Sequence, residues 1–146
     1  MHPYPHRYTV SASGGPVGRV RVAATGLSDI QTAAPAEFDG PGDVWSPESL
    51  LCASVADCFI LTFRAIAHAS KFEWSELSCR VEGVLERLDG VSQFTRYTTH
   101  ATLRVATGGE TARAHTLLEK AEQGCLIANS LKGKRTLEVQ IVDQTG

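Results

Sequence analysis

Residues 46–70 read SPESLLCASVADCFILTFRAIAHAS, and no residue after Pro47 in this run is glycine or proline. The first three residues are typical of a helix start. Ser46 can cap free N–H groups, Pro47 fits the first helical position, and Glu48 places an acid in the first turn. The run therefore predicts a helix from residue 47 to about residue 69, roughly 35 Å long at 1.5 Å per residue.

This predicted helix is apolar on most of its surface. At 100° per residue, Asp57, Arg64 and His68 fall on one narrow stripe, and nearly all of the remaining circumference is apolar. A helix of this kind must be buried on most sides, which one chain of 146 residues can hardly achieve alone. We therefore expect a second copy of the chain to cover part of it.

The size and charge of the chain exclude several classes of protein. Its 146 residues and 15.7 kDa predict one domain over residues 1–146, with a loose N-terminal tail at residues 1–7. A net charge of −2 and a pI near 6.2 give none of the basic excess of a nucleic-acid-binding protein. No run of about 18 apolar residues lacks polar breaks, and the N-terminus has no apolar signal stretch, so we expect a cytoplasmic protein that does not span a membrane.

Strand patterns precede the helix. Residues 8–34 are strand-like, and within Gly18–Ala24 the side chains alternate strictly, with Val20 and Val22 facing one way and Arg19 and Arg21 the other. Residues 35–46 contain two prolines and two glycines, which is typical of a long loop.

Further strands and helices follow the central helix. Residues 77–88 and 95–106 alternate again, and we expect a hairpin turn at the intervening GVSQF, residues 90–94, which makes the two strands antiparallel. Gly108 and Gly109 break the pattern. An amphipathic helix is predicted over residues 110–123 with Ala114, Leu117, Leu118 and Ala121 inward, then a short piece over 125–131 and a strand over 136–142. This order predicts an α+β fold with antiparallel sheet around a long central helix.

The four cysteines do not form a metal or disulfide pattern. The spacing of Cys52 and Cys58 is not that of zinc ligands, and six residues on one helix place them about 9 Å apart along the axis, too far for a disulfide. Cys79 lies on the apolar side of a strand. We interpret Cys52 and Cys79 as small buried hydrophobic residues.

Cys58 and Cys125 have a different setting. Cys58 lies in the middle of the helix at the edge of its polar stripe, and Cys125 follows Gly124 at the start of a short helix. Free N–H groups there are expected to favour a thiolate at Cys125. The residues alone leave both packing and catalysis open for these two thiols.

Two stretches resemble one known family. SPESLLCASVADCF, in which Cys58 follows Glu48 by ten residues, is similar to the central-helix motif of the OsmC/Ohr family, whose names stand for osmotically induced protein C and organic hydroperoxide resistance protein. EKAEQGCLIANSL resembles the second-cysteine motif of that family. The resemblance covers roughly residues 18–142.

The resemblance implies a thiol-dependent peroxidase for organic hydroperoxides, and for hydrogen peroxide as a further substrate, built as an intertwined homodimer. Cys58 would attack the peroxide, Cys125 would resolve the product, and Glu48 would correspond to the acid of the family's P-E motif. No cofactor or metal is implied, and an external thiol or dithiol would be the reductant.

The chain departs from the family pattern in two places. Ohr enzymes carry a catalytic arginine in a G-G-R-like turn, but the corresponding GGPVGR here has Pro16 at that place. Arg19 and Arg21 are the candidates for that role, with a solvated strand face as the alternative. Leu126 follows Cys125 where the family has proline. A non-enzymatic protein that binds a small molecule or senses redox state is therefore the competing interpretation.

Overall fold

The structure is a computed structural model that describes residues 1–106 and 110–143. These residues form two compact units, Met1–Leu51 and Cys52–Gly146, and each is described by itself. The single domain over residues 1–146 stays a prediction. Residues 1–10 contain no helix or strand and are exposed.

The first unit contains a small antiparallel sheet. Its strands are β1 (Ser11–Ser13), β2 (Val20–Ala23) and β3 (Ile30–Thr32), paired in that order. The predicted alternation is confirmed, because Val20 and Val22 are half-buried whereas Arg19 and Arg21 are exposed.

The long loop and the helix start also agree with the prediction. Within residues 35–46 the only regular element is the short 3-10 helix η1 (Ala36–Phe38), and α1 then spans Pro47–Ala69. The Ser46 hydroxyl accepts a hydrogen bond from the Ser49 N–H at 3.1 Å, and the Ser49 hydroxyl accepts one from the Ser46 N–H at 2.9 Å. This reciprocal cap holds the first turn of α1.

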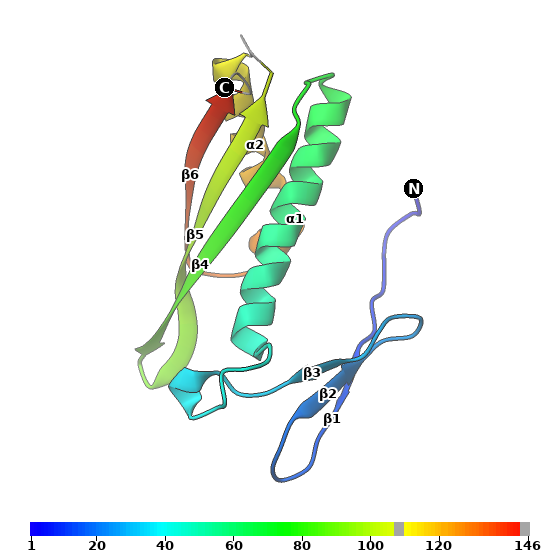
Figure 1. Ribbon diagram of the computed structural model, residues 1–146, viewed down its shortest axis with the longest axis vertical. Coiled ribbons are helices and arrows are strands. Elements are labelled where there is room, and N and C mark those ends of the chain that lie inside the picture. Colours follow the sequence, from blue (N-terminus) through cyan, green and yellow to red (C-terminus); the bar gives the residue numbers. More distant parts are fainter. Residues whose placement is uncertain (107–109, 144–146) are drawn as a thin grey trace. The chain divides into compact units, whose positions relative to one another are not determined.

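The second unit contains a sheet of three long strands, β4 (Glu76–Leu88), β5 (Val91–Val105) and β6 (Lys134–Asp143), in that order (Figure 1). β4 and β5 are antiparallel as predicted, but β5 and β6 are parallel, so the prediction of wholly antiparallel sheets is wrong. The reason is the connection: α2 (Thr111–Gly124) and α3 (Leu126–Asn129) carry the chain back along the sheet before β6 begins.

The β4–β5 turn also differs from the prediction. Leu88 pairs with Val91, so the turn consists of Asp89 and Gly90, and residues 91–94 belong to β5. Both turn residues have left-handed φ angles, 51° and 79°. Asp-Gly is a preferred pair for such a two-residue hairpin turn, because its backbone twist matches that of the two strands. The turn therefore begins at Asp89, one residue before the predicted turn at residues 90–94.

One core joins α1 and α2 to the same face of the long sheet. α1 contributes every fourth residue, and the four inward residues predicted for α2 are confirmed as buried. The largest side chains of this core are Phe59, Phe63, Phe72, Leu77, Leu103, Leu117 and Leu118. The pattern break predicted at Gly108–Gly109 lies outside the described residues.

The composition of α1 is that of a very apolar helix. With a mean hydropathy of 1.8 over 18 residues, it is long and apolar enough to cross a membrane, a property that the core helices of soluble proteins share. Asp57, Arg64 and His68 are exposed along one side, as the predicted stripe requires. The buried side packs in the core of the sheet through Phe59, Phe63 and Ala67, and its Val55 lies in a smaller cluster.

Candidate functional site

The fold of the second unit brings Cys58 and Cys125 together. Cys58 lies on α1, and Cys125 is the single residue between α2 and α3. Both belong to a small apolar cluster with Val55 and Ala128, and the Cys125 Sγ lies 4.0 Å from the Val55 carbonyl oxygen. Cys125 is fully buried and Cys58 is half-buried, and neither is in a disulfide. Two free thiols thus share one site, of which only Cys58 reaches the surface.

The surroundings of Cys58 favour its thiolate. Burial alone would raise the pKa of this thiol, but hydrogen bonds to the sulfur outweigh burial, so that its pKa is lowered. In order of size, the donors are the backbone N–H of Ile127, the thiol of Cys125, the hydroxyl of Thr62 and the backbone N–H of Leu126. Hydrogen bonds to a charged form stabilise it, so Cys58 is the more readily ionised thiol of the pair.

Cys125 is held as a thiol. Its pKa is raised to about 11, mainly by burial and also by the hydrogen bond with Cys58 and the negative charge of Cys58 and Glu122, against one backbone hydrogen bond from Ala128. The expectation that Cys125 at a helix start would itself favour a thiolate is therefore wrong. The N–H groups of Leu126 and Ile127 are directed at Cys58 instead, so they stabilise the neighbouring sulfur.

Thr62 is a site residue that the sequence interpretation missed. Its Oγ1 lies 3.8 Å from the Cys58 Sγ, one helical turn further along α1. A hydroxyl residue four positions after a helical cysteine is a signal that could have found it, because such residues are neighbours on the helix surface.

Cys52 and Cys79 lie in surroundings that disfavour a thiolate. Burial raises the pKa of Cys52, against a backbone hydrogen bond from Gly83. Burial raises the pKa of Cys79 to about 11, and charge on Glu122 and Cys125 acts in the same direction. Both thiols are partly buried and unbridged, which agrees with their interpretation as packing residues.

Glu48 lies in the first unit beside an apolar hollow of about 500 Å³. The hollow is lined mainly by aliphatic and aromatic side chains, among them Val20, Val22, Phe38 and Leu50. The Glu48 Oε1 is buried and has no hydrogen-bond partner within the described part of the chain. A buried carboxylate oxygen without a donor is costly, so this position calls for a hydrogen-bond donor or cation.

Arg19 and Arg21 have other acidic partners. Arg19 Nη2 donates to Asp43 at 3.1 Å, and Arg21 Nε donates to Asp29 at 2.6 Å. Both pairs are exposed and belong to the first unit. Neither arginine forms the pair with Glu48 that an arginine-orienting role would need.

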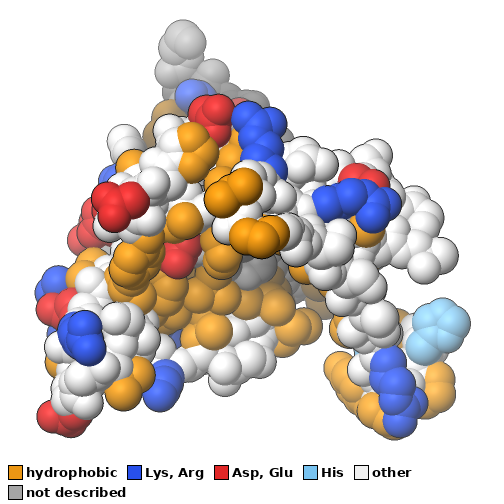
Figure 2. All heavy atoms as spheres, turned by 90° about the horizontal axis from the view of Figure 1, so that it is seen from below, with side chains coloured by type: hydrophobic (Ala, Val, Ile, Leu, Met, Phe, Trp, Pro, Cys, Tyr) orange, Lys and Arg blue, Asp and Glu red, His pale blue; other side chains and the backbone are white. Residues whose placement is uncertain are grey.

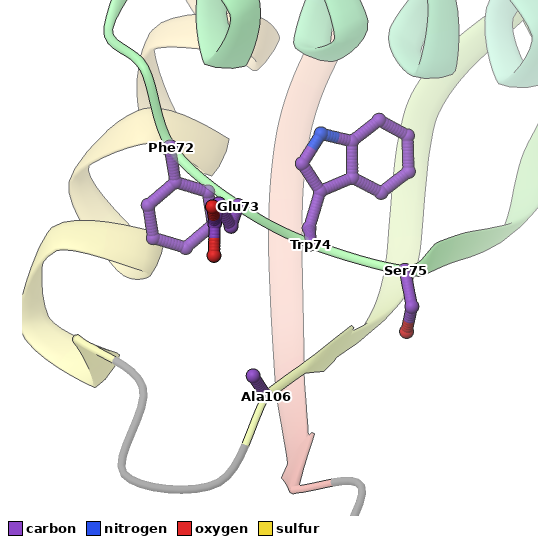
Figure 3. Close-up of a pocket in the computed structure, with 5 residues that line it drawn as sticks. All are labelled: Phe72, Glu73, Trp74, Ser75 and Ala106. Atoms are coloured by element: carbon purple, nitrogen blue, oxygen red, sulfur yellow. The ribbon is translucent and has the colours of Figure 1, made fainter.

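A second hollow, in the second unit, lies away from the two thiols Cys58 and Cys125 and contains neither of them in its lining. This hollow of about 370 Å³ is lined by Phe72, Glu73, Trp74, Ser75 and Ala106. Figure 3 shows these five side chains, with the Glu73 carboxylate beside the Phe72 ring. No thiol lines this hollow. Across residues 1–106 and 110–143, no three His, Cys, Asp or Glu side chains are grouped so that they could hold a metal ion.

The chain is similar in sequence and in fold to known proteins. The family model described as OsmC-like protein matches residues 40–140. An organic hydroperoxide resistance protein of Xanthomonas axonopodis pv. citri is 32% identical to this chain over 126 residues, which are 84% of each chain. The uncharacterized protein YmaD of Bacillus subtilis is 29% identical over 109 residues, which are 73% of each chain. The crystal structure of an organic hydroperoxide resistance protein OsmC from Legionella pneumophila superposes with a TM-score of 0.75 at 26% identity, over 95% of this chain and 98% of the other.

Proposed function

The chain belongs to the OsmC-like family, and from this premise we propose that it is a cysteine-based peroxidase that reduces organic hydroperoxides. The observation that carries the proposal is the pairing of Cys58, whose pKa is lowered, with Cys125, whose pKa is raised to about 11. A two-cysteine peroxidase needs one ionised thiol that attacks and one protonated thiol that waits. Relatives named for organic hydroperoxide resistance support the choice of substrate class.

The proposed reaction uses two steps at sulfur. The Cys58 thiolate attacks the terminal oxygen of the hydroperoxide, the O–O bond breaks, and the departing alkoxide takes a proton to leave as an alcohol. Cys58 is then a sulfenic acid. The Cys125 sulfur attacks it, a disulfide forms, and the hydroxyl leaves as water with the Cys125 proton. An external thiol or dithiol reduces the disulfide and returns both thiols, without any other cofactor.

The apolar hollow beside Glu48 supports an organic substrate. Its walls suit an alkyl or aryl group, and its volume of about 500 Å³ holds a small organic molecule. In this proposal the Glu48 carboxylate orients an arginine, Arg19 or Arg21, that stabilises the thiolate and the departing alkoxide. That role requires the arginine to exchange its partner Asp43 or Asp29 for Glu48.

The surface of α1 supports an intertwined homodimer. Only Val55, Phe59, Phe63 and Ala67 of this apolar helix are buried, and Leu61 is 48% exposed. Hydrophobic side chains also cover a broad part of the face seen in Figure 2. A second copy of the chain would remove this apolar surface from water. Four free thiols suit a reducing compartment such as the cytoplasm.

The test is thiol-dependent consumption of an organic hydroperoxide, such as cumene hydroperoxide, by the purified protein. Cys58→Ser should abolish turnover, and Cys125→Ser should leave one reduction event and accumulate over-oxidised Cys58. Cys52→Ser is the matched control on the same helix and should keep full activity. Peptide mapping after peroxide treatment should find a Cys58–Cys125 disulfide, and a principal oxidation product at Cys52 or Cys79 would contradict the assignment.

The competing function is binding of an apolar molecule or redox sensing without turnover. The observation that favours it is the pairing of Arg19 with Asp43 and of Arg21 with Asp29, which leaves Glu48 without an arginine. Arg19→Ala and Arg21→Ala separate the two functions. If one arginine supports catalysis, its removal should raise the Cys58 pKa and lower the rate of peroxide consumption. Unchanged alkylation profiles in both variants would assign these arginines to the surface.

A further inference from the structure

Cys125 occupies a break between two helices. α2 ends at Gly124, α3 begins at Leu126, and Cys125 between them has an extended backbone with φ −67° and ψ 105°. Its Sγ is buried beside the Val55 carbonyl oxygen and faces the Ala128 N–H of α3. Because Cys125 itself belongs to neither helix, the position of its sulfur also depends on what holds the two helix ends on either side of it.

Arg135 holds both ends. From the start of β6, its Nε donates to the Glu122 Oε1 at 2.8 Å, and its Nη2 donates to the main-chain oxygen of the same residue. Its Nη1 donates to the Asn129 Oδ1 at 2.7 Å. Glu122 lies three residues before Cys125 and Asn129 four residues after it, so one guanidinium spans the break.

Two further observations strengthen this link. Asn129 Nδ2 donates to the Gln123 main-chain oxygen at 2.9 Å, which ties the end of α3 directly to the end of α2. The Arg135 and Glu122 side chains are only 25% and 16% exposed, and no other ion pair of the described residues has both partners as well covered. A charge-assisted pair that is shielded from water in this way stabilises the fold more than an exposed surface pair does.

We propose that Arg135 is a positioning residue for Cys125, which fixes the helix break so that the second thiol reaches Cys58 in time to form the disulfide. The inference rests on the proposed function, in which Cys125 resolves the Cys58 sulfenic acid. Disulfide formation tolerates little error in the approach of the two sulfurs. Arg135 contacts neither sulfur, so its effect passes through the backbone on either side of Cys125.

The consequence is a competition at Cys58. Its sulfenic acid either reacts with Cys125 or meets a second peroxide, which oxidises it to the sulfinic acid. Without Arg135, residues 124–126 would sample more conformations, so the resolving step would slow. The N–H groups of Leu126 and Ile127 that donate to Cys58 would also be held less firmly, which would slow the first step, but the sulfenic acid divides between its two fates after that step. The ratio of sulfinic acid to disulfide is therefore the quantity that a positioning role should change.

The experiment compares Arg135→Ala with Arg104→Ala in the full chain. Arg104 is the control because it also sits on the long sheet and pairs with a glutamate, Glu76, at 3.7 Å, but it is half exposed. After one addition of cumene hydroperoxide, mass spectrometry measures the loss of the Cys58 thiol and the ratio of sulfinic acid to disulfide. Arg135→Ala should raise that ratio roughly tenfold, the size expected for losing charge-assisted hydrogen bonds, whatever its effect on the rate of thiol loss. Arg104→Ala should match the wild type.

Two additions make every outcome decisive. Arg135→Lys keeps the charge but lacks the fork that reaches Glu122 and Asn129 together. Compared with Arg135→Ala, it should recover thermal stability but keep a raised ratio of sulfinic acid to disulfide. Asn129→Ala removes one arm of the link and serves if Arg135→Ala does not fold. A wild-type ratio in folded Arg135→Lys and Asn129→Ala would overturn the proposal.

A glutathione redox buffer separates this inference from the proposed function. The equilibrium between the Cys58–Cys125 dithiol and disulfide needs no peroxidase activity. Removal of Arg135 should disfavour the disulfide there by roughly the same tenfold factor. If the wild type consumes no hydroperoxide but the shift in this equilibrium is present, the peroxidase proposal fails and the positioning role stands. If neither the ratio nor the equilibrium shifts, the positioning role fails.

Discussion

A few neighbouring donors lower the pKa of Cys58. Burial acts against its ionisation, and the hydrogen bonds from Ile127, Cys125, Thr62 and Leu126 reverse that effect. Three of these donors come from the Cys125–Ile127 segment and one from α1 itself. No guanidinium is among these donors, so the arginine of the proposed mechanism would add to their effect on the thiolate.

Thr62 offers a direct test of this view. Thr62→Val removes the hydroxyl that lies 3.8 Å from the Cys58 Sγ and preserves the shape of the side chain. The pKa of Cys58 should rise by roughly half to one unit, the equivalent of one hydrogen bond. The rate of iodoacetamide alkylation against pH measures this shift. Thr116→Val on α2, whose hydroxyl bonds only to the Ala112 carbonyl, is the control, and equal profiles for the two variants would exclude Thr62 as a donor.

The two thiols with raised pKa values predict how stability depends on alkaline pH. Cys79 and Cys125 titrate near pH 11 in the folded chain and near pH 9 when unfolded. Between these values the folded state holds protons that the unfolded state has lost, so the free energy of unfolding should fall as pH rises from about 9 to about 11. Urea unfolding under reducing conditions measures this slope. The slope is proportional to the number of protons released on unfolding, and Cys79→Ala should lower that number by up to about one. An unchanged slope would contradict the raised pKa of Cys79.

At the scale of elements, α1 and β4 approach each other closely at one glycine. A Cβ at Gly83 would lie 2.8 Å from the Cys52 Sγ and 3.0 Å from the Phe94 ring. The absence of a side chain at Gly83 lets the helix carrying Cys58 settle on the sheet.

Gly83→Ala should therefore destabilise the chain by about 1–3 kcal/mol through overpacking. Urea denaturation measures the change. Gly15→Ala is the control, because nothing lies within 4 Å of its Cβ position. Adding Cys52→Ala to Gly83→Ala should recover part of the loss, since it removes the nearer of the two clashing groups. Equal stability of Gly83→Ala and the wild type would show that α1 does not rest on β4 at this point.

The sequence predicts the bounds of the central helix but not the direction of every strand. α1 was predicted with its observed bounds because Ser46 and Pro47 mark its start and no glycine or proline interrupts it. The parallel pairing of β6 was missed because alternation gives the face of a strand but not its direction. The motifs around Cys58 and Cys125 pointed to the two thiols. The contacts of Arg135 depend on how β6, α2 and α3 meet, which no local pattern encodes.

At the scale of the whole molecule, the proposed function joins residues that one chain holds apart. Glu48 and Cys58 are ten residues apart on the unbroken helix α1, hence about 15 Å along its axis. Their side chains cannot meet across that distance. If both serve one site, the Glu48 at each Cys58 must come from the second copy, across a two-fold axis.

Mixed dimers test this shared site. Glu48→Ala and Cys58→Ser homodimers should each be inactive, because every site in them lacks one member. Unfolding the two together and refolding them should give about half heterodimers by random pairing, and each heterodimer holds one intact site of two. Hydroperoxide consumption should then return to roughly a quarter of the wild-type rate by the same pairing arithmetic. If Glu48 acts instead on the cysteine of its own chain through an intermediate residue, no mixed dimer contains a whole site. Heterodimers verified by mass spectrometry and still without activity would therefore rule out the shared site.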